Sequence, residues 1–262
     1  MPAQLRRPAS ARRDRARATA LGLLAGVLLD QFAGDPRRGH PVALFGSAAS
    51  RLEARMWRDD RAAGAGYAAL LTAAPAALGL LARRLPAPWL AAATALGTWM
   101  VLGSRSLPAE AEAVAAHLRR GDLPAARRRL THLVGRRTDI LDEAEIARAT
   151  VESVAENTSD AVVAPVAGGR ARRALAVARA DGRRHPSPNA GVAEAAFAGA
   201  LGVRLGGRND YGSHVEDRPV LGGDGRPPEL ADIARAARLS RAITVAAAVA
   251  SAAIALARGW GH

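Results

Sequence analysis

The chain has 262 residues and a formal net charge of +13, and all of its 37 basic residues are arginines. Without lysine it has no Walker-type phosphate loop and no lysine nucleophile; without cysteine it has no disulfide, thiolate metal site or thiol nucleophile. Aromatic residues make up only 3% of the sequence. Because nucleic-acid surfaces need stacking and base-reading groups, we expect no nucleic-acid partner despite the charge.

The N-terminal region begins with an arginine-rich stretch, residues 1–17, which we expect to be disordered. Residues 18–29 are apolar but too few to cross a bilayer comfortably, so they predict a re-entrant or interfacial segment. The polar stretch 30–61 contains GDPRRGHPV. In this motif Asp35 is suited to binding a metal or capping a turn, and His40 to contacting a phosphate or only a backbone carbonyl.

Two longer apolar segments follow. Residues 62–82 carry no charge and predict a transmembrane helix, and residues 86–103 predict a second. A polar region, 104–241, precedes a short alanine-rich segment, 242–257, which is either a last membrane helix or a buried helix of a soluble domain. The expected fold class is mainly α, a multi-pass helical membrane protein with a helical and loop region on its cytoplasmic face.

The arginines also predict the orientation of the chain. If 18–29 does not cross the membrane, nearly all arginines lie on one side, which the positive-inside rule makes the cytoplasm. The motif-bearing loops are then cytoplasmic. The expected organisation is a basic tail (1–17), an N-terminal membrane region (18–103), a cytoplasmic motif region (104–241) and a C-terminal membrane helix (242–262).

The stretch from Val134 to Val166 has the clearest helical pattern. Side chains spaced three or four residues apart place four acids and one arginine on one helix face: Glu145, Arg148, Glu152, Glu156 and Asp160. Asp142, with Glu145 three residues later, predicts a capping box. Such an acidic stripe is either a Mg²⁺ site or a solvated helix face stabilised by ion pairs.

Two later motifs add candidate residues. In GRRHPSPNAG, two prolines stiffen the loop that carries His185, Ser187 and Asn189, and a helix follows whose first amides suit an anion. Ser187 and Asn189 are equally suited to capping that helix, and Glu194 to a structural role or metal binding. RLGGRNDYG, residues 204–212, predicts a Gly-Gly turn in either a phosphate-facing loop or an ordinary one.

Taken in order, these motifs resemble the adenosylcobinamide-phosphate synthase family of cobalamin biosynthesis. The matching pieces are LLLDQFAGDPRRGHPV, VGRRT with LDE and IARATVESVAENTSDAVVAPV, HPSPNAG with EAAFAGALGVRLGG, and RPVLG. The resemblance implies a membrane-integral ligase that joins an aminopropanol unit, free or phosphorylated, to adenosylcobyric acid as an amide, with ATP and Mg²⁺. It further implies location in the inner cell membrane, contact with lipid, and other cobalamin-pathway enzymes as possible partners.

The resemblance gives the candidate residues their roles. It implies Mg²⁺ at the acidic helix, phosphate neutralisation by two arginines, and phosphate contact or proton transfer by the histidine of the HPSPN loop. These residues are Glu152, Glu156 and Asp160 for Mg²⁺, Arg136 and Arg148 for phosphate, His185 for proton transfer, Asn189 for orienting substrate, Ser187 for cofactor binding, and Asp35 and His40 as second-tier contacts.

The chain departs from the family pattern at one place. Family members carry several dozen residues between the acidic-helix motif and the HPSPN loop, whereas here Val166 is followed almost at once by GGRARRALAVARADGRRHPSPNAG. The alternative function is therefore a truncated, non-catalytic membrane paralogue that binds a corrinoid or a partner enzyme. A small transporter is disfavoured because 62–82 has no charge that could accompany a polar solute.

Overall fold

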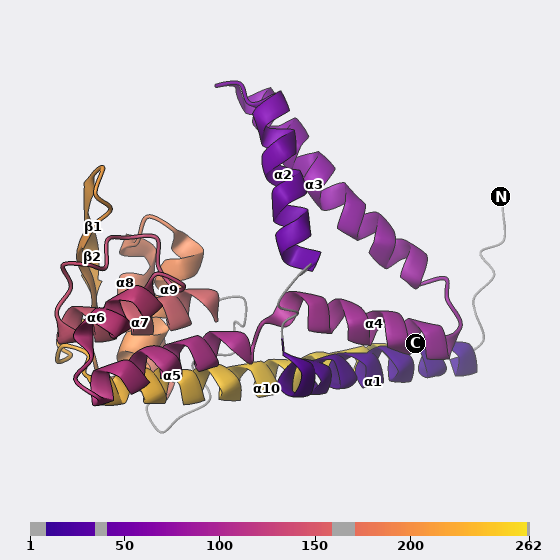
Figure 1. Cartoon of the computed structure of the whole chain (residues 1–262). Coiled ribbons are helices and arrows are strands. Elements are labelled where there is room, and N and C mark those ends of the chain that lie inside the picture. The colour runs from indigo at the N-terminus through magenta and orange to yellow at the C-terminus, as the bar shows by residue number, and fades with distance from the viewer. Residues whose placement is uncertain (1–8, 35–40, 159–170, 261–262) are drawn as a thin grey trace. The chain divides into compact units, whose positions relative to one another are not determined.

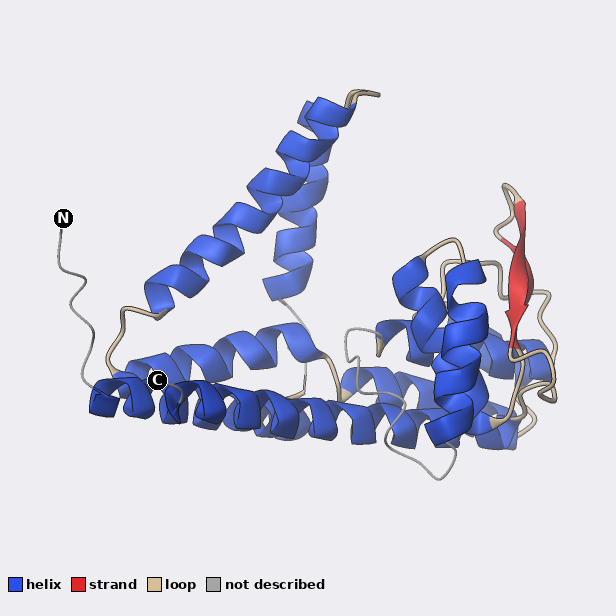
Figure 2. Cartoon of the chain, turned by 180° about the vertical axis from the view of Figure 1, so that it is seen from behind, coloured by secondary structure: helices blue, strands red, loops and turns tan. Residues whose placement is uncertain are grey.

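The computed structural model describes residues 9–34, 41–158 and 171–260, and these are mainly helical (Figures 1 and 2). The chain folds as two compact units, one of Met1–Gly103 with Ala248–His262 and one of Ser104–Ala247. The division after Gly103 falls where the second long apolar segment of the sequence ends. The motif positions Asp35, His40 and Asp160 lie outside the described residues.

The first unit contains four helices and the end of a fifth. They are α1 (Ala9–Ala33), α2 (Pro41–Met56), α3 (Arg61–Ala82), α4 (Ala87–Leu102) and the last turns of α10 (Leu230–Trp260). Three of the described helices, α1, α3 and α10, are long and apolar enough to cross a membrane. No residue of α3 is buried against protein, and its Leu78 and Leu80 are exposed. The predicted fold class, a mainly α multi-pass membrane protein, is confirmed.

Helix α1 is longer than the sequence analysis predicted. Residues 9–17, expected to be disordered, form its first turns, and 18–29 is its middle rather than a separate short segment. The prediction was wrong because an apolar run was equated with the whole helix, whereas arginines continue a helix readily at its end. The resulting helix has the length of a membrane span.

Helices α1 and α4 pack closely through small residues. A Cβ atom added at Gly22 would lie 2.6 Å from the Ala91 carbonyl oxygen, and one added at Gly26 would lie 2.5 Å from Thr98 Cβ. The spacing of the two glycines is that of the small-xxx-small motif, which lets helix backbones approach in a membrane. Larger side chains at these two positions would force the helices apart.

Contacts at the helix ends define the direction of each helix in this unit. Arg15 Nη1 donates to the Leu85 carbonyl oxygen at 2.8 Å, and Trp99 Nε1 donates to the Gly34 carbonyl oxygen at 3.1 Å, so α1 and α4 run parallel. The Arg13 guanidinium lies 4.6 Å above the Trp260 ring, so the end of α10 meets the start of α1. The start of α1, the end of α3 and the end of α10 therefore share one end of the unit.

The second unit holds the other helices, a hairpin and the start of α10. Its elements are α5 (Ser106–Arg119), α6 (Leu123–Leu130), α7 (Glu143–Asn157), α8 (Ala171–Asp181), the 3-10 turn η2 (Gly182–Arg184), α9 (Pro188–Leu201), β1 (Leu205–Asp210) and β2 (Val215–Leu221). The segment predicted as a last membrane helix, 242–257, is part of the single helix α10, which begins at Leu230.

Helix α7 is the centre of this unit. The predicted capping box starts it: the Glu145 amide donates to Asp142 Oδ1 at 2.8 Å, and the Asp142 amide donates to Glu145 Oε2 at 2.9 Å. Every residue from Ile146 to Ala155 except Arg148 is buried. The helix packs against α5, α6 and α9, so most of its surface faces protein. A solvated acidic face is therefore wrong for Glu152, which lies inside.

The segment predicted as a Gly-Gly loop is a strand. β1 and β2 pair antiparallel, with Gly207 opposite Arg218 and an irregularity between Leu205 and Gly207. Gly206 has φ +86°, and a Cβ atom there would lie 2.1 Å from the Pro219 carbonyl oxygen. This position needs glycine, because no other residue fits both the backbone angle and the close partner strand.

Membrane labelling tests the helix directions. If α1, α3 and α4 cross the membrane, residues 10 and 84 lie on one side and residues 59 and 120 on the other, because each helix connects the two ends of the unit. We expect an impermeant maleimide to separate the single-cysteine variants Ser10→Cys and Arg84→Cys from Asp59→Cys and Arg120→Cys. The chain contains no other cysteine, so no background label arises. Labelling of residues 10 and 59 from the same side would restore the non-crossing segment of the sequence analysis.

Candidate functional site

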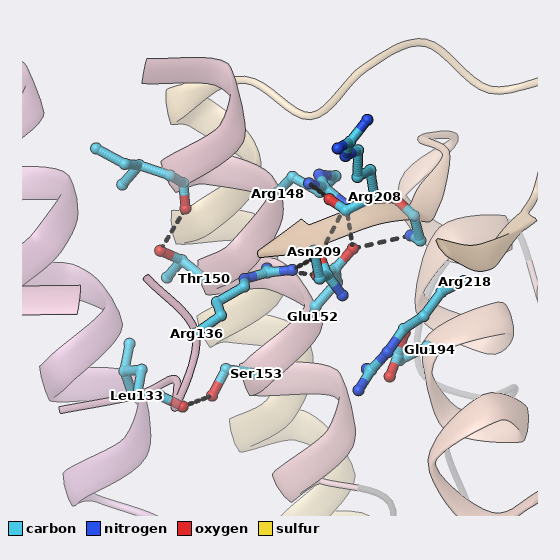
Figure 3. Close-up of polar contacts among 12 residues, drawn as sticks. Leu133, Arg136, Arg148, Thr150, Glu152, Ser153, Glu194, Arg208, Asn209 and Arg218 are labelled. Atoms are coloured by element: carbon cyan, nitrogen blue, oxygen red, sulfur yellow. Dashed lines mark hydrogen bonds and ion pairs between the residues drawn. The ribbon is translucent and has the colours of Figure 1, made fainter. Parts of the chain in front are cut away.

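Four motif segments meet in the second unit. They are the loop with Arg136, helix α7, the HPSPN loop that leads into α9, and the β1–β2 hairpin. Figure 3 shows side chains from three of these segments and Glu194 from the middle of α9. Residues far apart in the sequence, such as Arg136 and Asn209, form direct hydrogen bonds.

A buried ion pair joins the arginine loop to α7. Arg136 Nη2 lies 2.6 Å from Glu152 Oε2, and the side chains are only 6% and 8% exposed. The Gly206 amide donates to Glu152 Oε1 at 2.8 Å, and Arg136 also donates to Asn209 Oδ1. Both carboxylate oxygens of Glu152 thus have a donor, as a charge removed from water requires.

Arg148 reinforces this centre from one turn earlier on α7. Its Nη1 lies 3.5 Å from Glu152 Oε1, and its Nη2 donates to the Arg208 carbonyl oxygen at 3.0 Å. It also donates to the Gly206 carbonyl oxygen and so fastens the hairpin to the helix. Arg148 borders a pocket of about 280 Å³ with Arg204 and Gly207. Asp142 and Glu145 line the same pocket, so its charged lining holds two arginines and two carboxylates.

A second buried pair lies between the HPSPN loop and α9. His185 Nδ1 lies 3.0 Å from both the amide nitrogen and the carbonyl oxygen of Ser187, so the Ser187 backbone holds this side of the ring. His185 Nε2 lies 3.7 Å from Glu194 Oε1, which is longer than a hydrogen bond. Both side chains are almost fully buried. As placed, neither ring nitrogen of His185 faces solvent.

Glu194 is the unusual member of this pair. Among the residues that the structure describes, neither of its carboxylate oxygens has a hydrogen-bond partner. Burial, with a further contribution from the Glu152 charge, raises the pKa of Glu194 to about 8, although Arg218 opposes the shift. A carboxyl group that stays protonated at neutral pH is typical of functional sites. The sequence signal was available: Glu194 is the one charged residue of an otherwise apolar helix.

The other predicted contacts have different surroundings. Ser187 and Asn189 are exposed at the start of α9, and Ser187 makes no side-chain cap bond. Glu156 is exposed near the end of α7. Asp35, His40 and Asp160 are not among the described residues, so the structure does not place them.

The described residues do not form a ready metal site. No group of three or more His, Asp or Glu side chains within 9–34, 41–158 and 171–260 is placed to hold a metal ion. Glu152 does not fit the role as it stands, since its two oxygens accept hydrogen bonds from Arg136 and Gly206. The Mg²⁺ assignment of Glu152, Glu156 and Asp160 stays a prediction.

Comparison with known proteins identifies the class of protein. The family model described as CobD/Cbib protein matches residues 23–171 and 166–240, which is most of the chain. The chain belongs to this family, as its motifs predicted. No solved structure matches it.

Three relatives named as CobD proteins are similar to the chain over most of its length. The chain is 42% identical over 294 aligned positions to "Cobalamin biosynthesis protein CobD" of Mycobacterium tuberculosis, covering 88% of this chain and 94% of the relative. It is 34% identical to the CobD protein of Geobacter metallireducens, over 78% of this chain and 87% of the relative. With Stutzerimonas stutzeri CobD the identity is 36%, over 79% and 88%. These matches support a role in cobalamin biosynthesis.

The same comparisons support a missing internal segment. The alignment with the mycobacterial relative spans 294 positions, more than the 262 residues of this chain, so the relative has residues without a counterpart here. The family model matches in two pieces that meet at residues 166–171. The break coincides with the point after Val166 at which the sequence departs from the family pattern.

The pH dependence of stability tests the state of Glu194. Because its pKa is raised on folding, its stabilising contribution is complete below the ordinary carboxyl pKa and is lost as the pH rises toward about 8. The loss is at most about 1.4 kcal/mol per pH unit. Glu194→Gln cannot lose a proton, so it should remove this slope between pH 5 and 8.

Hydrogen exchange of peptides from α9, measured across that pH range, reports the change. The matched control is Glu143→Gln, at an exposed position in the first turn of α7, which should keep the wild-type slope. An unchanged slope in Glu194→Gln would show that Glu194 is already ionised at neutral pH.

Proposed function

We propose that this protein is built for the ATP-dependent ligation of an aminopropanol, free or phosphorylated, to a carboxylate of adenosylcobyric acid as an amide. The observation that carries the proposal is the convergence of motif segments. The arginine loop, α7 and the hairpin contribute side chains to one buried centre. The HPSPN loop contributes His185 beside Glu194 of α9, and the charges of Glu152 and Arg136 act on Glu194. Cobalamin biosynthesis is the role in the names of the relatives.

The proposed chemistry has two stages. Phosphoryl transfer from ATP activates the substrate carboxylate, and the amine then displaces the phosphate. Catalysis of this kind depends on positioning and on neutralising charge rather than on a protein nucleophile. A chain without cysteine or lysine is compatible with that requirement.

We assign contact with the phosphate groups of the substrates to two arginines and to the residues at the start of α9. Arg148, which borders a pocket with Arg204, neutralises phosphate oxygens. Arg136 holds Glu152 and has an Nε atom without a hydrogen-bond partner among the described residues. Ser187 and Asn189, which are exposed where α9 begins, are the proposed contacts for an anionic group at the helix N-terminus.

The Mg²⁺ ion of this scheme arrives with ATP as part of the nucleotide substrate. Glu156, exposed near the end of α7, and Asp160 are the proposed protein contacts. Glu152 would first have to release Arg136. We assign the protein to the inner cell membrane with its motif unit in the cytoplasm, where ATP and other cobalamin-pathway enzymes are available.

The missing segment favours a second candidate function. A chain without several dozen family residues beside the acidic motif could bind a corrinoid or a partner enzyme without turnover. A misplacement of about 1 Å can cost roughly a hundredfold in rate. The break after Val166 removes far more than is needed for such a displacement, whereas the Arg136–Glu152 ion pair before it and the His185–Glu194 contact after it persist.

Complementation of a strain lacking the synthase distinguishes the two candidates. We expect the chain as written to insert in membranes but to support growth on adenosylcobyric acid poorly or not at all, with activity at least about a hundredfold below that of a repaired chain. The repaired chain carries a family-type segment between Val166 and Ala167. A glycine-serine segment of equal length is the matched control and should not restore growth. Full growth with the unrepaired chain would contradict the expectation, and failure of the repaired chain would remove the ligase proposal.

A further inference from the structure

Glu194 and His185 leave polar atoms unsatisfied inside the second unit. Both carboxylate oxygens of Glu194 and the Nε2 atom of His185 are buried and have no hydrogen-bond partner among the described residues. Glu194 is 1% exposed. Because leaving a buried polar group unpaired is costly, native proteins keep such groups mainly where a ligand or a function requires them.

The surroundings of Glu194 indicate the charge of its ligand. Figure 3 shows the Arg218 side chain beside Glu194, but Arg218 is hydrogen bonded within its own hairpin, to Glu216 at 3.1 Å and to Tyr211 at 3.0 Å. Arg218 and Arg136 are the cations that act on Glu194, and Glu152 and Glu156 are the carboxylates. The position next to Glu194 therefore already accommodates a cation that does not bond to it.

Three kinds of ligand can be compared. An anion needs several hydrogen-bond donors, whereas a carboxyl group supplies at most one O–H, and the two arginines that act on Glu194 are accompanied by two carboxylates. A metal ion needs more ligands than Glu194 and His185, and no group of three exists among the described residues. A primary ammonium group brings several N–H donors and one positive charge, which suits two carboxylate oxygens that have no hydrogen-bond partner among the described residues.

We propose that Glu194 binds the amino group of the amine substrate and accepts its proton before the amine reacts. This assignment rests on the proposed ligase function, which supplies the identity of the amine. His185 lies beside the proposed site, with Nε2 3.7 Å from Glu194 Oε1 and Nδ1 held by the Ser187 backbone.

The proton and bond balance of the step is complete. Glu194 releases its own proton to water when the ammonium ion binds beside it. One proton of the ammonium ion then passes to the resulting carboxylate, which gives a neutral amine and a carboxylic acid. The amine nitrogen then forms a bond to the acyl carbon of the activated carboxylate, and the carbon–oxygen bond to phosphate breaks. The second proton of the nitrogen leaves with the phosphate, so the products are an amide and hydrogen phosphate.

Access to Glu194 requires one side chain to move. Arg218 is partly exposed, and its hydrogen bonds are to residues of the hairpin region, so it can turn outward without breaking a bond to α9. The incoming ammonium group would then replace the guanidinium beside Glu194. Removing Arg218 should accordingly help the amine to bind.

Binding of 1-amino-2-propanol to the purified full chain in detergent tests the proposal. Calorimetric titration should show binding that Glu194→Gln weakens about tenfold or more, because a charged acceptor is lost. The control variant Glu143→Gln should bind as the wild type does. 1,2-Propanediol, which has a hydroxyl in place of the amine, should bind the wild type and Glu194→Gln equally. Arg218→Gln should bind the amine more tightly than the wild type.

Each outcome is decisive. Absence of amine binding by the wild type, or equal binding by Glu194→Gln, overturns the proposal. If Glu194→Gln fails to fold, amine binding by Arg218→Gln is the test. Unchanged or weaker amine binding by that variant overturns the proposal. Glu194-dependent amine binding together with a repaired chain that forms no amide would reject the ligase function while the amine site stands.

Discussion

The second unit depends on the buried ion pair between Arg136 and Glu152. Two opposite charges taken out of water stabilise a fold only when their remaining hydrogen-bonding groups are also satisfied. Here the Gly206 amide and Asn209 complete the pair, so the arginine loop, α7 and the hairpin are held in one arrangement. Gly206 can supply its amide to Glu152 because its positive φ lets the strand approach both α7 and Pro219. The same arrangement places Glu194 of α9 in a low-dielectric position near Glu152.

The sequence predicted those parts of the fold that local patterns determine. The capping box of Asp142 and Glu145, the helix over the acidic stretch and the charge-free span of α3 follow from residue spacing and hydropathy. The resemblance to a family, which the comparisons confirmed, came from ordered motifs rather than from composition. Local patterns succeed at these places because capping and helical periodicity involve residues only a few positions apart.

Features that depend on distant residues could not be predicted. Glu152 reads as one member of a solvated stripe, and only Arg136 and the hairpin make it a buried ion-pair partner. Gly206 reads as a turn, although its partner strand makes it part of β1. The sequence predicts a structural or metal-binding role for Glu194, and only the packing of α9 reveals that its carboxylate has no hydrogen-bond partner in the part of the chain that the structure describes. The sequence predicts disorder for residues 9–17 because they are rich in arginine, whereas α1 begins at Ala9 and continues through these arginines.

A double-mutant cycle on Arg136 and Glu152 tests the central claim most directly. The tryptophans all lie in the first unit, so hydrogen exchange of α7 peptides is the appropriate measure of stability. Arg136→Met and Glu152→Gln should each lower the opening free energy of α7 by about 3–5 kcal/mol. The double variant should lose at least about 1.5 kcal/mol less than the two single losses together, since neither partner is then left charged and alone. Additive losses, within about 0.5 kcal/mol, would contradict the view that this ion pair organises the site.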